Sequence, residues 1–138
     1  FLDFGFIEKS FEILDTDEKV FTVWLRAHND TKGHKIEKEN KILLADDEYY
    51  LMDQYHKNVW CGFTFNPGLR RTSDCMMLHP YDQLEVRTTS KKKGMHIMHE
   101  MDISIYYQEL GFRGAITSKV DGYVKHIGGK RHIPLPWQ

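Results

Sequence analysis

The residue types best suited to chemistry gather in one stretch, residues 96–102, which reads His-Ile-Met-His-Glu-Met-Asp. Imidazole and carboxylate groups this close together could ligate a metal ion or act as an acid–base pair. On a helix, His96, His99 and Glu100 would share one face. On a strand, His96 and His99 point to opposite faces, and His96 lies roughly 13 Å from Glu100 at about 3.3 Å per residue. The chemistry therefore depends on the element that carries the cluster.

The local pattern favours a strand. Between residues 97 and 107 most apolar side chains occupy odd positions, whereas Glu100, Asp102 and Ser104 occupy even ones. Alternation of this kind is typical of a half-buried strand. We therefore expect no catalytic residue, no metal and no cofactor, which makes an enzyme the less favoured class. A metal-binding protein or hydrolase that uses the 96–100 cluster remains the alternative. No G-x-S-x-G elbow and no phosphate-binding glycine motif occurs.

A second group of residues suggests binding to an anionic surface. Lys91, Lys92 and Lys93 are consecutive, and Lys130 and Arg131 lie near the C-terminus. Such clustered cations attract anionic lipid headgroups and nucleic-acid phosphate. The Arg70-Arg71 pair would add to the same surface. A small-ligand or nucleic-acid binding module is a further alternative.

The last residues form an apolar hook. Leu135 and Trp137 alternate with Pro134 and Pro136, which exclude this segment from a central strand. We expect the segment to lie extended on a groove or a partner, and we assign Leu135 and Trp137 to self-association.

Charge is divided along the chain. Residues 1–85 hold 10 Lys and Arg against 16 Asp and Glu, a net charge of −6, whereas residues 86–138 hold 9 against 4, a net charge of +5. Unlike surfaces on one small protein favour head-to-tail association, although a fold that mixes the two halves would hide the division.

The first half of the chain predicts two strands and one helix. Residues 1–14 alternate loosely, with a bulge expected near Gly5, and residues 19–26 form the clearest strand. Residues 28–41 are polar and predict a long exposed loop. The main helix is expected from Leu44 to Tyr55, capped by Asp46 or Asp47.

The second half predicts strands and turns. Strands are expected at residues 59–65, 74–78, 83–88, 97–107 and 112–120. Gly111 should end the fourth, and Asp121-Gly122 is a hairpin-turn dipeptide that should lead into a strand over residues 123–127. The expected fold class is α+β: a mostly antiparallel sheet packed with one main helix. A single domain spans residues 1–138, with an extended tail over about 128–138.

Composition supports a globular intracellular protein. Apolar residues make up 41% of the chain and aromatic residues 13%, and no apolar run is long enough to span a membrane. Cys61 and Cys75 lack C-x-x-C spacing and predict buried free thiols, with a disulfide between them as the alternative. Because the chain begins with Phe1 and not Met, we expect a fragment or processed product.

The order of elements resembles the globular domain of rhabdovirus matrix proteins. The residues that carry the resemblance are the strand at 21–26, the Asp47-Glu48-Tyr49-Tyr50 segment and a late pair of segments at 102–107 and 112–116. The resemblance implies a non-enzymatic virion protein that self-associates and contacts the inner membrane face and the nucleocapsid. It also implies a cytoplasmic or virion-interior location, and no small-molecule cofactor.

Overall fold

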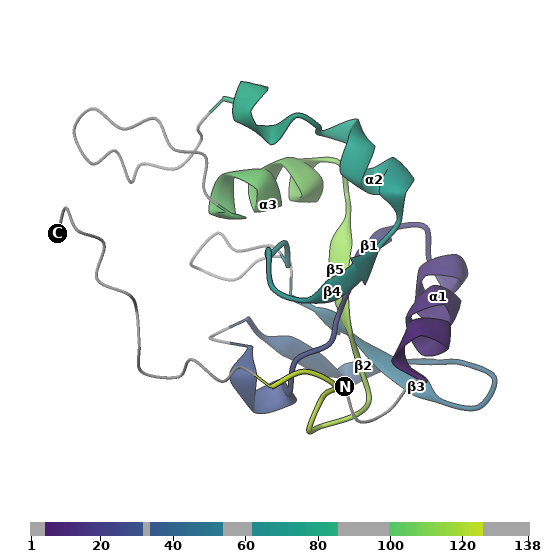
Figure 1. Ribbon diagram of the computed structural model, residues 1–138. Coiled ribbons are helices and arrows are strands. Elements are labelled where there is room, and N and C mark those ends of the chain that lie inside the picture. The colour runs from purple at the N-terminus through teal and green to yellow at the C-terminus, as the bar shows by residue number, and fades with distance from the viewer. Residues whose placement is uncertain (1–4, 32–33, 54–61, 86–99, 126–138) are drawn as a thin grey trace, which may run out of the picture.

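The computed structural model describes residues 5–31, 34–53, 62–85 and 100–125, which are built around a five-stranded sheet (Figure 1). The strand order is β2-β3-β5-β1-β4. β1 and β5 are parallel, and the other three pairs are antiparallel. The expected α+β class with a mostly antiparallel sheet is therefore confirmed. The strands are β1 (Val20–Trp24), β2 (Ile36–Leu43), β3 (Glu48–Met52), β4 (Gly68–Arg70) and β5 (Arg113–Thr117).

Helices cover both faces of the sheet. α1 (Phe6–Thr16) packs on one face, where Ile13 and Leu14 join Val20, Leu51 and other strand side chains in an apolar cluster. α3 (Glu100–Glu109) packs on the other face, where Ile103 and Tyr107 meet Phe21 of β1, and α2 (Thr72–Met77) lies between α3 and the end of α1 (Figure 1). Short 3-10 turns occur at His28–Asp30 and Tyr81–Gln83. The described part of the chain thus holds three α-helices, where one was expected.

The N-terminal strand prediction is wrong, because residues 6–16 form α1. The buried residues Ser10, Ile13 and Leu14 recur at spacings of three and four, which is the period of a helix. The Ser10 hydroxyl donates to the Phe6 carbonyl at 2.6 Å, which also fits a helical turn. The apparent alternation mixed exposed and buried positions, since Phe11 is exposed and Ile13 is buried.

The main predicted helix, residues 44–55, is wrong where the structure describes it. Residues 36–52 form a β2–β3 hairpin, so β2 also takes the last six residues of the exposed loop expected over 28–41. Asp47 is a turn residue and not a helix cap: its carbonyl accepts from the Leu44 amide at 2.7 Å. Tyr49 and Leu51 alternate with Tyr50 and point into the core beneath α1, as a strand requires.

The predicted strand at 97–107 is wrong from residue 100 onward, where α3 begins. Ile103 and Tyr107 are buried together, four residues apart, and Ser104 between them is also buried. Gly111 does end the element, as expected, but as a helix terminus. It has a φ of +80°, and the Phe112 amide donates to the Tyr107 carbonyl at 2.9 Å, the long bond of a glycine-terminated helix.

Of the shorter predicted strands, some are confirmed and others are wrong. The strands expected at 19–26 and 112–120 are confirmed as β1 and β5. The strand expected at 74–78 is wrong, because α2 covers most of it, and residues 62–65 and 83–85 are not strand. Gly122 turns the chain with a φ of +65°, but Val124 then forms an isolated parallel bridge to Arg26 and no strand.

A second apolar cluster lies between the sheet and α3. The Phe21 ring of β1 stacks on Tyr107 with centroids 4.3 Å apart, and Phe63, Phe112 and Ile103 complete the cluster. Offset aromatic pairs of this kind contribute about 0.5–1.5 kcal/mol beyond burial. The two clusters hold α1 and α3 on opposite faces of β1. The segments that lead from these helices into β1 and β5 lie side by side, and the Arg113 amide donates to the Lys19 carbonyl at 2.8 Å.

Candidate binding cleft

An open cleft of about 450 Å³ lies where α1, α2 and the start of β1 meet. Its apolar wall is Leu14 and Phe112. The charged lining residues are Asp15, Glu18, Lys19, Arg71 and Asp74. Charged side chains from the end of α1, the segment before β1 and the start of α2 come together here.

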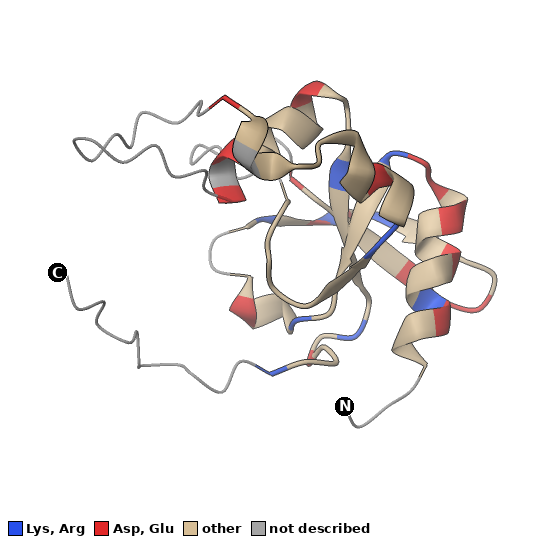
Figure 2. Cartoon of the chain, turned by 45° about the horizontal axis from the view of Figure 1, so that its top comes forward, with Lys and Arg blue, Asp and Glu red and all other residues tan. Residues whose placement is uncertain are grey.

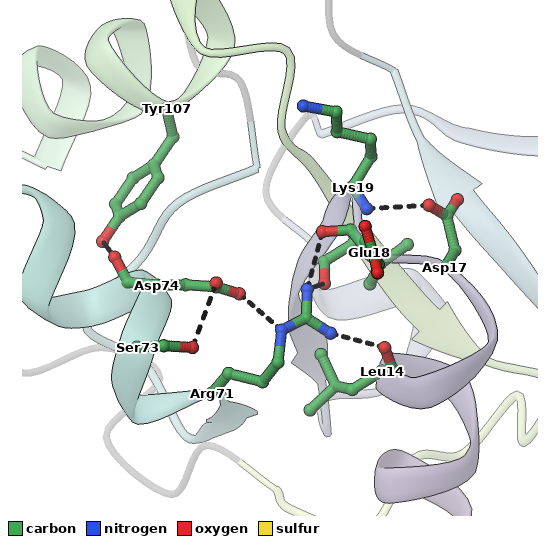
Figure 3. Close-up of polar contacts among 9 residues, drawn as sticks. Leu14, Asp17, Glu18, Lys19, Arg71, Ser73, Asp74 and Tyr107 are labelled. Carbon is green, nitrogen blue, oxygen red and sulfur yellow. Dashed lines mark hydrogen bonds and ion pairs between the residues drawn. The ribbon is translucent and has the colours of Figure 1, made fainter.

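Arg71 holds the cleft together (Figure 3). Its Nε donates to Asp74 Oδ2 at 2.8 Å, and its Nη2 donates to the carbonyls of Glu18 at 2.7 Å and Val20 at 2.6 Å. Its Nη1 donates to the Leu14 carbonyl. The planar guanidinium can satisfy several acceptors at fixed angles, which a lysine ammonium cannot do. Arg71 therefore joins the end of α1, the start of β1 and α2.

Asp74 is the buried partner of Arg71. It is 7% exposed, and its backbone carbonyl accepts from the Tyr107 hydroxyl at 3.0 Å. The Tyr107 hydroxyl also lies 3.1 Å from the Tyr81 hydroxyl. Burial, followed by the bond to Tyr81, raises the pKa of Tyr107 far above its usual value. A phenol held neutral and hydrogen-bonded in this way positions α3 against α2.

These bonds limit what the cleft can do. Each nitrogen of Arg71 already donates to an oxygen of the protein, so its charge is used to hold the fold. Lys19 is the exposed cation of the lining; its Nζ lies 5.3 Å from the centre of the Phe112 ring. Asp15 and Glu18 are exposed beside it. The cleft is an apolar wall with a mixed-charge rim, which suits an amphipathic peptide segment.

Arg70 and Arg71 do not form the basic surface expected of them. Arg71 is used as described, and Arg70 Nη2 donates to the Thr64 carbonyl while its guanidinium lies 5.1 Å from the centre of the Phe63 ring. Both arginines stabilise the fold. The sequence signal for Arg71 was its position three residues before Asp74, a spacing that lets the two side chains meet on one helical turn.

Glu100 is the one member of the predicted metal cluster that the structure describes. Its carboxylate accepts from the Thr64 hydroxyl at 3.1 Å and from the Phe65 amide at 2.5 Å, so it fastens α3 to the loop before β4. His96 and His99 lie outside the described residues. No group of three potential metal ligands occurs within residues 5–31, 34–53, 62–85 and 100–125.

The predicted contact residues also fall outside the described part of the chain: Lys91, Lys92, Lys93, Lys130, Arg131, Leu135 and Trp137. The same holds for Cys61 and for the expected tail. Cys75, on α2, is a free, half-buried thiol. None of the described helices is both long and apolar enough to cross a bilayer.

The surface of the described residues is acidic. They carry 11 Lys and Arg against 19 Asp and Glu, a net charge of −8, whereas all other residues carry 8 against 1, a net charge of +7. Figure 2 shows acidic residues along α1 and the turns beside it. The division is sharper than the one between the two halves of the sequence.

No protein-family model, no curated protein and no solved structure matches this chain.

Proposed function

We propose that this chain is a non-enzymatic structural protein that self-associates and contacts an anionic surface, as a viral matrix protein does. The observation that carries the proposal is the division of charge between the described residues, with a net charge of −8, and the remaining residues, with a net charge of +7. Unlike charges on two parts of one protein attract a second copy, and clustered lysines attract lipid or nucleoprotein phosphate. The location that goes with this role is the cytoplasm or the virion interior.

The contacts of the cleft support an interaction role over catalysis. Arg71 and Asp74 pair with each other in the cleft, and Arg71 also donates to the Glu18 carbonyl. Outside the cleft, Tyr107 and Glu100 join α3 to α2 and to the loop before β4. Large apolar side chains remain exposed on the described surface: Ile7, Phe11, Leu43, Phe65, Met76, Met77, Leu110 and Val120. An apolar side chain in water gains free energy when a partner covers it.

Self-association is tested by light scattering on the full chain. We expect the mean mass to rise with protein concentration at low ionic strength and to fall toward the monomer in about 1 M salt, where charges are screened beyond about 3 Å. A monomer at every concentration and ionic strength would remove self-association from the proposal.

Contact with an anionic surface is tested by co-sedimentation with phosphatidylserine vesicles. The Lys91→Ala/Lys92→Ala/Lys93→Ala variant should bind on the order of a hundredfold more weakly, because each of the three cations contributes about 1 kcal/mol near such a membrane. The matched control is Lys35→Ala/Lys38→Ala/Lys41→Ala, which removes the same charge from exposed positions of the described body. Equal binding by the two variants would show that net charge alone governs attachment and would remove the patch.

A further inference from the structure

One side of α1 exposes apolar side chains together with acidic ones. Ile7 is 41% exposed and Phe11 is 56% exposed, and their spacing of four residues places them together on the helix surface. Glu8, Glu12 and Asp15 are exposed beside them. We name these five residues the α1 face. The face lies away from Lys9, which pairs with Asp47 at the β2–β3 turn.

The α1 face leads directly into the cleft. Asp15, at its end, is itself a cleft residue, and Leu14 next to it supplies the apolar wall. The exposed apolar side chains of this surface are Ile7 and Phe11, whereas Leu14 and Phe112 in the cleft are almost buried. The acidic side chains of Glu12, Asp15 and Glu18 border the surface. A ligand that fits this surface is an extended segment with apolar side chains and positive charge.

The chain itself contains such a segment. Residues 130–137 read Lys-Arg-His-Ile-Pro-Leu-Pro-Trp, with two cations followed by three apolar side chains at alternate positions. We infer that the α1 face and its cleft bind residues 130–137 of a second copy, with Lys130 and Arg131 against the acidic side chains and Leu135 and Trp137 on the apolar ones. The inference rests on the proposed self-association and names the surface that it uses.

Such a contact is heterologous, because the segment of one copy meets the α1 face of the next. Each copy offers one segment and one face, so the contact can build open chains, rings, or a reciprocal pair in which each copy gives its segment to the other. The same segment could instead reach its own α1, because Tyr123, two residues before the end of the described chain, packs on Phe6 with ring centroids 5.8 Å apart. The experiment below separates the two arrangements.

Two full-length variants each remove one side of the contact. Phe11→Ser removes the centre of the α1 face, and Trp137→Ser removes the end of the segment. Each variant alone should raise the dissociation constant of self-association at least tenfold. The matched control is Leu43→Ser, which removes an apolar side chain that is 70% exposed at another place and should leave association unchanged.

Mixing the two variants is the decisive step. The Phe11→Ser chain keeps an intact segment and the Trp137→Ser chain keeps an intact face, so the mixture should form a one-to-one pair of wild-type affinity that does not grow further. Sedimentation velocity with one variant fluorescently labelled measures this. A wild-type protein that associates while the mixture stays monomeric would overturn the inference and leave self-association standing. A wild-type protein that is monomeric throughout, as a segment folded onto its own α1 would make it, overturns both.

Discussion

Arg71 joins three elements through one side chain. Its acceptors belong to α1, to the turn before β1, to β1 itself and to α2, and its side chain is 25% exposed. Hydrogen bonds to a charged group contribute about 1.5–3 kcal/mol each when a partner would otherwise be left unsatisfied. Because several acceptors share this one donor group, we expect the loss of Arg71 to cost more stability than its exposure suggests.

Replacing Arg71 should therefore cost stability. We expect Arg71→Ala to lower the free energy of unfolding by about 3 kcal/mol, and Arg71→Lys to lower it by a smaller but clear amount, because an ammonium cannot reach all four acceptors. Urea denaturation measures both. Lys19→Ala, in the same cleft but exposed, is the control and should stay within about 0.5 kcal/mol of wild type. A fully stable Arg71→Lys would show that charge, and not the planar geometry, holds the cleft.

Tyr107 makes the free energy of unfolding depend on pH in the alkaline range. Burial raises the pKa of Tyr107 above its unfolded value of about 10, so the folded state keeps a proton that the unfolded state releases. The contribution is therefore complete below about pH 10 and declines as pH rises above it, by up to about 1.4 kcal/mol per pH unit. In the Tyr107→Phe variant, the free energy of unfolding should fall less steeply with pH between about pH 9 and pH 11. The difference in slope should correspond to about one proton and is measured by urea denaturation. An unchanged slope would contradict the assignment.

At the scale of elements, the sequence predicted strands well where β-branched and aromatic residues dominate. β1 was expected because Val20–Trp24 is a run of β-branched and aromatic residues, and β5 because residues 112–120 lie between Gly111 and the Asp121-Gly122 turn. α1 and α3 were missed because each contains apolar residues at both period-two and helical spacings. Only the packing of Ile13 and Leu14 under the sheet, and of Ile103 and Tyr107 on Phe21, decides between the two periods.

The cleft could not be predicted for a related reason. Leu14, Arg71 and Phe112 are far apart in the sequence, and they meet only because β4 and β5 both pair with β1. The Arg71–Asp74 spacing was visible in the sequence, but nothing local indicated that the main-chain acceptors would come from α1 and β1.

A comparison of two isoleucines tests whether residues 100–109 are helix or strand. On a strand, Ile103 and Ile105 would share one face and lose similar stability on truncation. On α3, Ile103 is 1% exposed in the aromatic cluster, whereas Ile105 is only half-buried. We expect Ile103→Ala to cost about 3 kcal/mol and Ile105→Ala about 1 kcal/mol or less. Equal losses in urea denaturation would favour the strand.

A comparison of two glycines tests the turns that end α3 and follow β5. Both have positive φ, which costs a residue with a side chain about 1 kcal/mol or more. At Gly111 an added Cβ would meet nothing closer than Lys19 Nζ at 3.9 Å, whereas at Gly122 it would lie 2.4 Å from the Ala27 nitrogen. Gly122→Ala should therefore lower the melting temperature well beyond Gly111→Ala, and similar shifts would contradict the close approach at Gly122.

For the molecule as a whole, the main feature is the division of charge between the described residues and the rest of the chain. Because the described body carries −8 and the remaining residues +7, the chain is almost neutral overall while its parts attract. Steering by such fields is strong at low ionic strength and weak at high ionic strength. Head-to-tail association of the α1 face with residues 130–137 uses that attraction and covers Ile7 and Phe11, which would otherwise remain in water.

The most direct test of this association is a charge reversal on both sides of the contact. Glu12→Lys/Asp15→Lys and Lys130→Glu/Arg131→Glu should each raise the dissociation constant of self-association at least tenfold, because like charges then face each other. A chain that carries all four substitutions restores opposite charges and should return to within about threefold of wild type, since only a true pair compensates in a double-mutant cycle. Measured by sedimentation at low salt, recovery supports the contact. The contact would be contradicted if the chain with all four substitutions associated as weakly as the chains with either pair alone.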